Sequence, residues 1–137
     1  MHIKHNFIIN LYLQLSTCKY TTRSIGGTIS NYVDLPTGNE AQLTNAIASV
    51  GPISVAIDAT PLQSYKSGIL TGVKCSSSSL NHGVLVTGYG TDSKTGKAYY
   101  IVKNSWGPSW GENGYFRIAR NENNLCGIAT APSYPIV

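Results

Sequence analysis

The change of pattern at Gly51-Pro52 constrains the fold of this chain more than any other feature of the sequence. Before it, Leu43, Ile47 and Val50 recur at intervals of four and three residues, the spacing of one helix face. After it, apolar residues come in short runs bounded by Gly, Asp, Asn or Ser, which is typical of strands and turns. This single change of period predicts an α+β fold, with one main helix followed by a largely antiparallel sheet or barrel.

The helix is predicted over about residues 40–50. Asn39 stands at the N-cap position with Gln42 three residues later, and Gly51-Pro52 ends the helix. Strands are predicted at residues 53–57, 83–89, 99–103 and 115–119. The polar segment 91–97 has the composition of a hairpin loop, so the strands on its two sides should pair antiparallel.

Size and charge exclude several classes of protein. The length of 137 residues suits one domain, and a composition of 42% hydrophobic and 12% charged residues is not that of a disordered chain. The net charge is +4, but the basic residues are scattered from Lys4 to Arg120 without a run, so we expect no nucleic-acid partner. No stretch approaches the ~18 consecutive apolar residues of a membrane span, so we expect no membrane partner.

Residues 1–15 differ from the rest of the chain. Lys4 and the semi-apolar run 7–15 have the outline of a secretory signal, but Asn10 and Gln14 interrupt the run and no small-x-small cleavage site follows. The alternatives are an artefact of the reading frame and an extra leading strand. We therefore separate a divergent, weakly signal-like segment, residues 1–15, from the domain, residues 16–137.

The three cysteines, Cys18, Cys75 and Cys126, are an odd number. In an oxidising compartment one bridge can form and one thiol is left over, which suggests a missing partner chain. No Cys-x-x-Cys pair is present, and His82 is the only histidine beyond the first five residues, so we expect no metal and no cofactor.

His82 stands at the start of a predicted strand, after the polar loop 76–79. By itself, such a histidine is more often a surface or packed structural residue than a catalytic one. The segment 103–111 changes this interpretation, because it holds Asn104 together with Trp106 and Trp110. An asparagine carboxamide can accept a hydrogen bond from an imidazole and fix its tautomer, and an indole can shield that bond from water. This is the orienting role in a Cys-His-Asn arrangement.

Several segments together resemble one family. Residues 81–90 and 103–107 resemble the histidine and asparagine motifs of papain-like cysteine peptidases. Residues 50–59, 65–69 and 126–135 resemble the cathepsin L branch in order and spacing. The resemblance covers about residues 18–137 and implies the right-hand, C-terminal lobe of the papain-like fold.

The resemblance is to one half of the family's active site. In the family the nucleophile lies in a Cys-Gly-Ser/Ala-Cys-Trp/Tyr segment, with the histidine ~130 to 150 residues downstream. Here only 81 residues precede His82, and the sequence contains no such segment. The glutamine that supplies the oxyanion donor would also lie upstream. We therefore expect a chain that is catalytically incomplete when alone.

The resemblance implies roles for four residues at the reacting centre. His82 matches the general acid/base and Asn104 the residue that orients it. Trp106 matches the indole that covers their hydrogen bond and borders the leaving-group side of the cleft. Asn81 matches a position that faces substrate.

The resemblance also implies a substrate pocket and a disulfide. Ala56, Gly83 and Ala131 match positions that line the pocket for the second side chain before the scissile bond, and their small size would favour bulky apolar residues there. Cys75 and Cys126 match a bridge within this half. Cys18 matches a cysteine whose partner belongs to the absent half, so it should be free.

Three interpretations of the whole chain remain. The first is a cysteine endopeptidase present as a fragment, which would cleave peptide or protein substrates when completed by an N-terminal lobe, in a lysosomal or extracellular location. The second is a non-catalytic half-cleft that binds a protease lobe, an inhibitor or a peptide, and the third is a pseudogene product that does not fold. An in-frame upstream exon with a Cys-Gly-Ser-Cys-Trp-like segment would support the first. We expect self-association through the exposed lobe interface, and a monodisperse monomer would favour the second interpretation.

Overall fold

Helix α1 (Glu40–Ser49) occupies the predicted segment to within one residue. The computed structural model describes Thr21 and residues 25–137, so the predictions for residues 1–15 and Cys18 lie outside the described residues. The side chain of Asn39 accepts a hydrogen bond from the backbone N–H of Gln42 at 2.9 Å and caps the first turn, as the sequence predicts.

The apolar face of α1 is shorter than its sequence pattern. Leu43 and Ile47 are buried, whereas Val50 follows the last helical residue and is 50% exposed. Gly51 has a φ of +117°, a conformation that favours glycine, and here the chain leaves the helix axis for the next strand. The helix therefore ends before the last residue of its apolar pattern.

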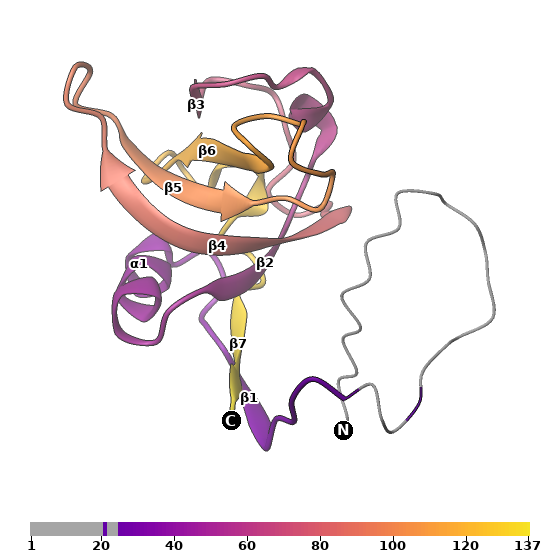
Figure 1. Cartoon of the computed structure of the whole chain (residues 1–137). Coiled ribbons are helices and arrows are strands. Elements are labelled where there is room, and N and C mark those ends of the chain that lie inside the picture. Colours follow the sequence, from indigo (N-terminus) through magenta and orange to yellow (C-terminus); the bar gives the residue numbers. More distant parts are fainter. Residues whose placement is uncertain (1–20, 22–24) are drawn as a thin grey trace.

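Seven strands form one open, mixed sheet in the order β1-β7-β2-β4-β5-β6-β3 (Figure 1). All neighbouring pairs are antiparallel except β3 with β6. The α+β fold is confirmed. A sheet or a barrel was expected, and the chain forms an open sheet, because β1 and β3 are its two edge strands and do not pair with each other. The strands are β1 (Asn31–Asp34), β2 (Ile53–Ile57), β3 (Ile69–Leu70), β4 (His82–Thr91), β5 (Ala98–Lys103), β6 (Tyr115–Ala119) and β7 (Ser133–Ile136).

The four predicted strands correspond to β2, β4, β5 and β6. The predicted hairpin loop joins β4 to β5, which pair antiparallel from Leu85↔Lys103 to Thr91↔Ala98. The strands β1, β3 and β7 were not predicted. β1 and β7 pair with each other near the two ends of the described chain (Figure 1), a contact that no local sequence pattern announces.

The core lies between α1, the inner face of the central strands and two short 3-10 helices, η2 (Thr60–Ser64) and η3 (Leu125–Gly127). Residues of β2 alternate: Val55 is buried, whereas Ser54 and Ala56 lie on the other face. Burying a large apolar side chain stabilises the fold by about 1.5 to 3 kcal/mol. The largest fully buried side chains include Leu43, Ile53, Ile57, Leu62, Val86, Tyr100, Val102, Phe116, Ile118 and Ile128.

Cys75 and Cys126 form a disulfide, with their Cα atoms 5.0 Å apart. The pairing implied by the resemblance is therefore confirmed. The bridge connects the segment after β3 to η3 and closes a loop with a sequence separation of 51 residues. The free state of Cys18 stays a prediction.

Candidate active site

The register of β4 and β5 brings the two predicted catalytic residues together. His82 is the first residue of β4, and Asn104 directly follows the last residue of β5. β4 and β5 are antiparallel neighbours with Leu85 opposite Lys103. The first residue of β4 and the residue after β5 therefore lie at the same end of this strand pair. Residues that are 22 positions apart in sequence are thus neighbours in space.

The imidazole of His82 is hydrogen-bonded to the side chain of Asn104, with 2.8 Å between Nε2 and Oδ1. The same Oδ1 accepts a hydrogen bond from the backbone N–H of Ser105 at 2.8 Å. A backbone N–H can only donate, so the atom facing it is the amide oxygen, and Nε2 of His82 must be the donor. This tautomer leaves Nδ1 as the proton-accepting nitrogen of the ring.

Asn104 is almost completely buried, with 7% of its surface exposed. Its Nδ2 atom is also buried and has no hydrogen-bond partner among the described residues. An unpaired buried donor costs about 1 to 3 kcal/mol, and such groups call for an explanation other than stability. The energetic cost of burying Nδ2 unpaired therefore fits a residue whose role is to orient the imidazole.

Trp106 packs against the imidazole from the side of the pocket. The centroids of the His82 and Trp106 rings are 5.1 Å apart, and their planes differ by 31°. Trp110 meets Trp106 edge-on at 5.1 Å and also contacts Tyr65 and Phe116. Trp110 therefore serves as packing, and it connects Trp106 to the core.

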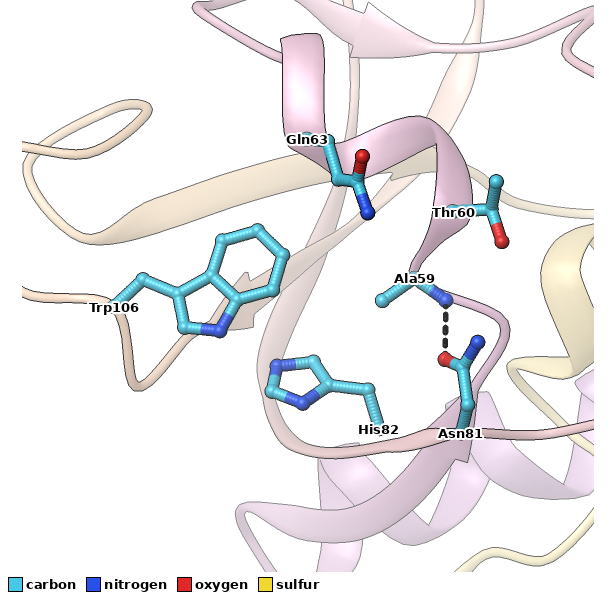
Figure 2. Close-up of a pocket in the computed structure, with 6 residues that line it drawn as sticks. All are labelled: Ala59, Thr60, Gln63, Asn81, His82 and Trp106. Carbon is cyan, nitrogen blue, oxygen red and sulfur yellow. Dashed lines mark hydrogen bonds between the residues drawn. The ribbon is translucent and has the colours of Figure 1, made fainter. Parts of the chain in front are cut away.

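A pocket of about 230 Å³ lies next to the imidazole (Figure 2). Three of its lining residues, Asn81, His82 and Trp106, were predicted as site residues from the sequence. The other three, Ala59, Thr60 and Gln63, come from η2 and its N-cap and were not predicted. Pro61 in the first turn of η2 was the available signal for a short helix, but nothing in the sequence places that helix over His82.

The side chain of Asn81 lies along the wall of this pocket. Its Oδ1 accepts a hydrogen bond from the backbone N–H of Ala59 at 2.9 Å (Figure 2). Its Nδ2 lies 3.4 Å from a carboxylate oxygen of Asp58. The residue is exposed, yet both ends of its amide are bound by the segment that follows β2.

The three small residues assigned to a second pocket do not line this one. Ala56 and Gly83 are register partners on β2 and β4, on the face of the sheet away from Val55. Ala131 lies two residues before β7, which pairs with β2 at Ser54↔Ser133. A Cβ added at Gly83 would meet no atom within 4 Å, so this part of the surface is open.

Two properties of the described residues bear on ligands and membranes. Among these residues, no group of three His, Cys, Asp or Glu side chains is placed to hold a metal ion. Within the same part of the chain, no helix has the length and apolar character needed to cross a membrane.

The comparison with protein families places residues 4–136 in the profile described as "Papain family cysteine protease". Over 122 residues the chain is 54% identical to a Caenorhabditis elegans protein named "Cathepsin L-like", a match that covers 88% of this chain and 36% of that protein. Human "Cathepsin L2" is 50% identical over 124 residues, 88% of this chain and 37% of that protein. The chain thus spans about a third of the length of these curated relatives.

Solved structures give the same comparison in three dimensions. Digestive procathepsin L 3 of the Tenebrio molitor larval midgut superposes with a TM-score of 0.84 and 50% identity, over 90% of this chain and 40% of that one. The bromelain protease of Ananas comosus, solved in complex with the E64 inhibitor, gives 0.77 and 44% identity, over 85% of this chain and 55% of that one. The chain is therefore similar to these two structures in sequence as well as in fold.

Proposed function

Because the chain belongs to the papain family of cysteine proteases, we propose that residues 16–137 are the histidine-bearing, C-terminal lobe of a cathepsin L-like cysteine endopeptidase. Residues 1–15 are then a divergent segment outside this lobe. The observation that supports the proposal most strongly is the hydrogen bond of His82 to Asn104, whose oxygen is fixed as an acceptor by Ser105. This arrangement prepares Nδ1 of His82 to accept a proton.

In the proposed reaction His82 acts as general base and then as general acid. A cysteine thiol from the other lobe gives its proton to Nδ1, and the thiolate attacks the carbonyl carbon of the scissile peptide bond. The imidazolium then protonates the leaving amine. Water hydrolyses the acyl-enzyme with the same nitrogen as the base, and Asn104 holds the ring throughout.

The nucleophile and the oxyanion donor are proposed to come from outside the 137 residues. Cys75 and Cys126 are joined to each other and cannot serve as nucleophiles. Cys18 is similar to a structural half-cystine of the family and is not proposed as a substitute. Loss of the nucleophile alone costs about 10⁶ in kcat in a comparable triad, so the chain by itself should not cleave peptides.

The pocket beside His82 is proposed as the binding site for substrate on the leaving-group side. Trp106 supplies an apolar side chain to its lining, and Asn81 supplies a polar one. Ala56, Gly83 and Ala131 are proposed to line the pocket for the second residue before the scissile bond, where their size leaves room for a bulky apolar side chain. Peptide or protein substrates are the proposed partners.

A lysosomal or extracellular location is proposed for the whole protein. The disulfide between Cys75 and Cys126 suits an oxidising compartment. The structural relative from Tenebrio molitor is described as a digestive procathepsin of the larval midgut.

A complementation assay tests the proposed function. The chain is mixed with a separately produced N-terminal part of the Tenebrio molitor enzyme that carries its nucleophile, and cleavage of a cathepsin L peptide substrate is followed with reducing agent present. Each part alone should be inactive, and the mixture should be active. His82→Ala should abolish this activity, whereas the matched histidine replacement His2→Ala should retain it.

Two results would contradict the proposal. One is turnover by the lone chain that depends on reducing agent and disappears in Cys18→Ser, which would place the nucleophile within the chain. The other is a mixture that forms a stable complex but stays inactive, which would favour a non-catalytic binding protein.

A further inference from the structure

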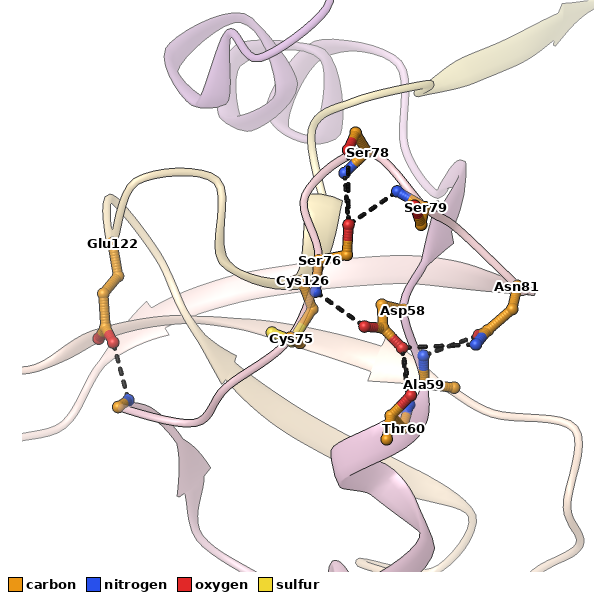
Figure 3. Close-up of a disulfide and its surroundings, with 11 residues drawn as sticks. Asp58, Ala59, Thr60, Cys75, Ser76, Ser78, Ser79, Asn81, Glu122 and Cys126 are labelled. Atoms are coloured by element: carbon orange, nitrogen blue, oxygen red, sulfur yellow. Dashed lines mark hydrogen bonds between the residues drawn. A yellow bond between two sulfur atoms is a disulfide. The ribbon is translucent and has the colours of Figure 1, made fainter.

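The carboxylate of Asp58, directly after β2, accepts hydrogen bonds from three separate segments (Figure 3). Its Oδ2 accepts from the backbone N–H of Ser76 at 2.8 Å. Its Oδ1 accepts from the backbone N–H and the hydroxyl of Thr60, at 3.0 and 2.6 Å, and lies 3.4 Å from Nδ2 of Asn81. Only 8% of the residue is exposed.

These donors belong to the parts of the chain that surround His82. Ser76 follows Cys75, so the bond to Asp58 holds the loop that leads from the disulfide to β4. Thr60 is the first residue of η2, so its two bonds fix the start of the pocket wall. Asn81 is the residue immediately before His82.

Asn81 connects Asp58 to His82, the next residue in the chain. Its amide is held between Asp58 and the backbone N–H of Ala59, and its own backbone N–H donates to the carbonyl of Ile57 at 3.0 Å. The residue before His82 is therefore held at three points, one at the last residue of β2 and two in the segment that follows it. His82 thus follows a residue whose backbone and side chain are both bound, and its ring is hydrogen-bonded to Asn104.

A simpler account would be that Asp58 only shapes its own turn. Asp92 in the β4–β5 hairpin does this: it accepts from the hydroxyl and backbone N–H of Thr95 and from the backbone N–H of Lys94. All of these donors lie within three residues of Asp92. Asp58 makes the same kind of turn with Thr60 but also binds Ser76 and Asn81, which are 18 and 23 positions away.

We propose that Asp58 is a positioning residue for His82, whose carboxylate, acting through the Asn81 amide, fixes the first residue of β4 against the wall of the pocket. The contribution of Asp58 to catalysis rests on the proposed function, whereas its effect on the orientation of the His82 ring does not. An amide at position 58 could not replace the carboxylate, because in either orientation its NH₂ group would face a backbone N–H, that of Ser76 or that of Thr60.

The charge of Asp58 also suits a mildly acidic compartment. The hydrogen bond from the backbone N–H of Ser76, followed by those from Thr60, lowers the pKa of Asp58 to about 2. The carboxylate therefore remains an acceptor at pH values where ordinary carboxylates begin to take up protons.

The test measures the His82 ring in the full-length, ¹⁵N-labelled chain carrying His2→Gln and His5→Gln, so that one imidazole remains. Long-range ¹H–¹⁵N correlation spectra show which ring nitrogen carries the proton. The parent chain should show protonated Nε2 and unprotonated Nδ1 as two well-separated resonances. Asp58→Asn should reduce this separation as the ring loses its single orientation, and the control Asp92→Asn should not.

A second variant tests the route through Asn81. Asn81→Ala removes an exposed side chain, and it should produce the same loss of separation as Asp58→Asn. Adding Asp58→Asn to Asn81→Ala should cause little further change, since the two residues act in series. If Asp58→Asn does not fold, Asn81→Ala alone decides the question.

The proposal is overturned if a folded Asp58→Asn or Asn81→Ala chain keeps the parent nitrogen resonances of His82. It is also overturned if Asp92→Asn changes them equally. In the complementation assay Asp58→Asn should lower kcat by roughly 10 to 100-fold, the scale of a small misplacement of a catalytic group. Because the spectra need no activity, an inactive mixture with the expected spectra would count against the proposed function and not against the role of Asp58.

Discussion

Removal of the Cys75–Cys126 bridge should destabilise the chain strongly. The two cysteines are 51 residues apart in sequence, and in the chain-entropy relation a loop of this length stabilises the folded state by about 4 kcal/mol. A typical domain has a total stability of only about 5 to 15 kcal/mol. The bridge would therefore supply a large part of the free energy that keeps this chain folded.

The perturbation is the double variant Cys75→Ala/Cys126→Ala. Alanine is preferred to serine because position 126 is 2% exposed, and a buried hydroxyl would add its own cost. We expect the Tm to fall by roughly 10 to 20 °C, measured by circular dichroism without reducing agent. Cys18→Ala is the matched control, and it should change the Tm little.

Two observations would refute this reasoning. A double variant whose Tm differs no more from the parent than that of Cys18→Ala would show that loop closure contributes little. Peptide mapping of the oxidised monomer that found Cys18 bridged to either of the other cysteines would overturn the pairing.

Three further predictions concern stability and association. Glu40→Gln should lower the free energy of unfolding in urea by about 1 to 3 kcal/mol. The Glu40 carboxylate accepts hydrogen bonds from the backbone N–H groups of Asn121 and Asn124 at 2.6 and 2.8 Å, and an amide there can accept only one of them. An unchanged free energy of unfolding would contradict this. Asp58 has a depressed pKa in the folded state, so its contribution to stability should be complete above about pH 4 and be lost as the pH falls towards about 2. Asp58→Asn should flatten this part of the profile of stability against pH, and an unchanged profile would contradict the prediction. The purified chain should self-associate in light-scattering measurements as its concentration rises, because the proposed lobe interface is uncovered, and a monodisperse monomer at high concentration would favour a protein adapted to exist alone.

The sequence predicted the elements whose signals are local. The helix repeat, the Asn39 cap and the break at Gly51-Pro52 defined α1 to within one residue, since each acts over a few positions. The strands β2, β4, β5 and β6 were found from short apolar runs between turn residues, and the polar loop between β4 and β5 predicted their pairing. The residues of the candidate site came from motifs, in which residue type and order are enough.

The tertiary structure alone decided how distant segments meet. Strand β7 includes Pro135, which has no N–H to donate, and β3 has two residues, so neither carries a strand pattern; both form because the folded core brings a partner alongside. In the same way, no sequence pattern near Asp58 predicts its hydrogen bonds to Ser76 and Asn81. These bonds depend on the path of the chain from Cys75 to the start of β4. Local patterns determine which residues can form hydrogen bonds, but the long-range path of the backbone determines their partners. For this reason the position of η2 beside His82 could be seen only in the folded structure.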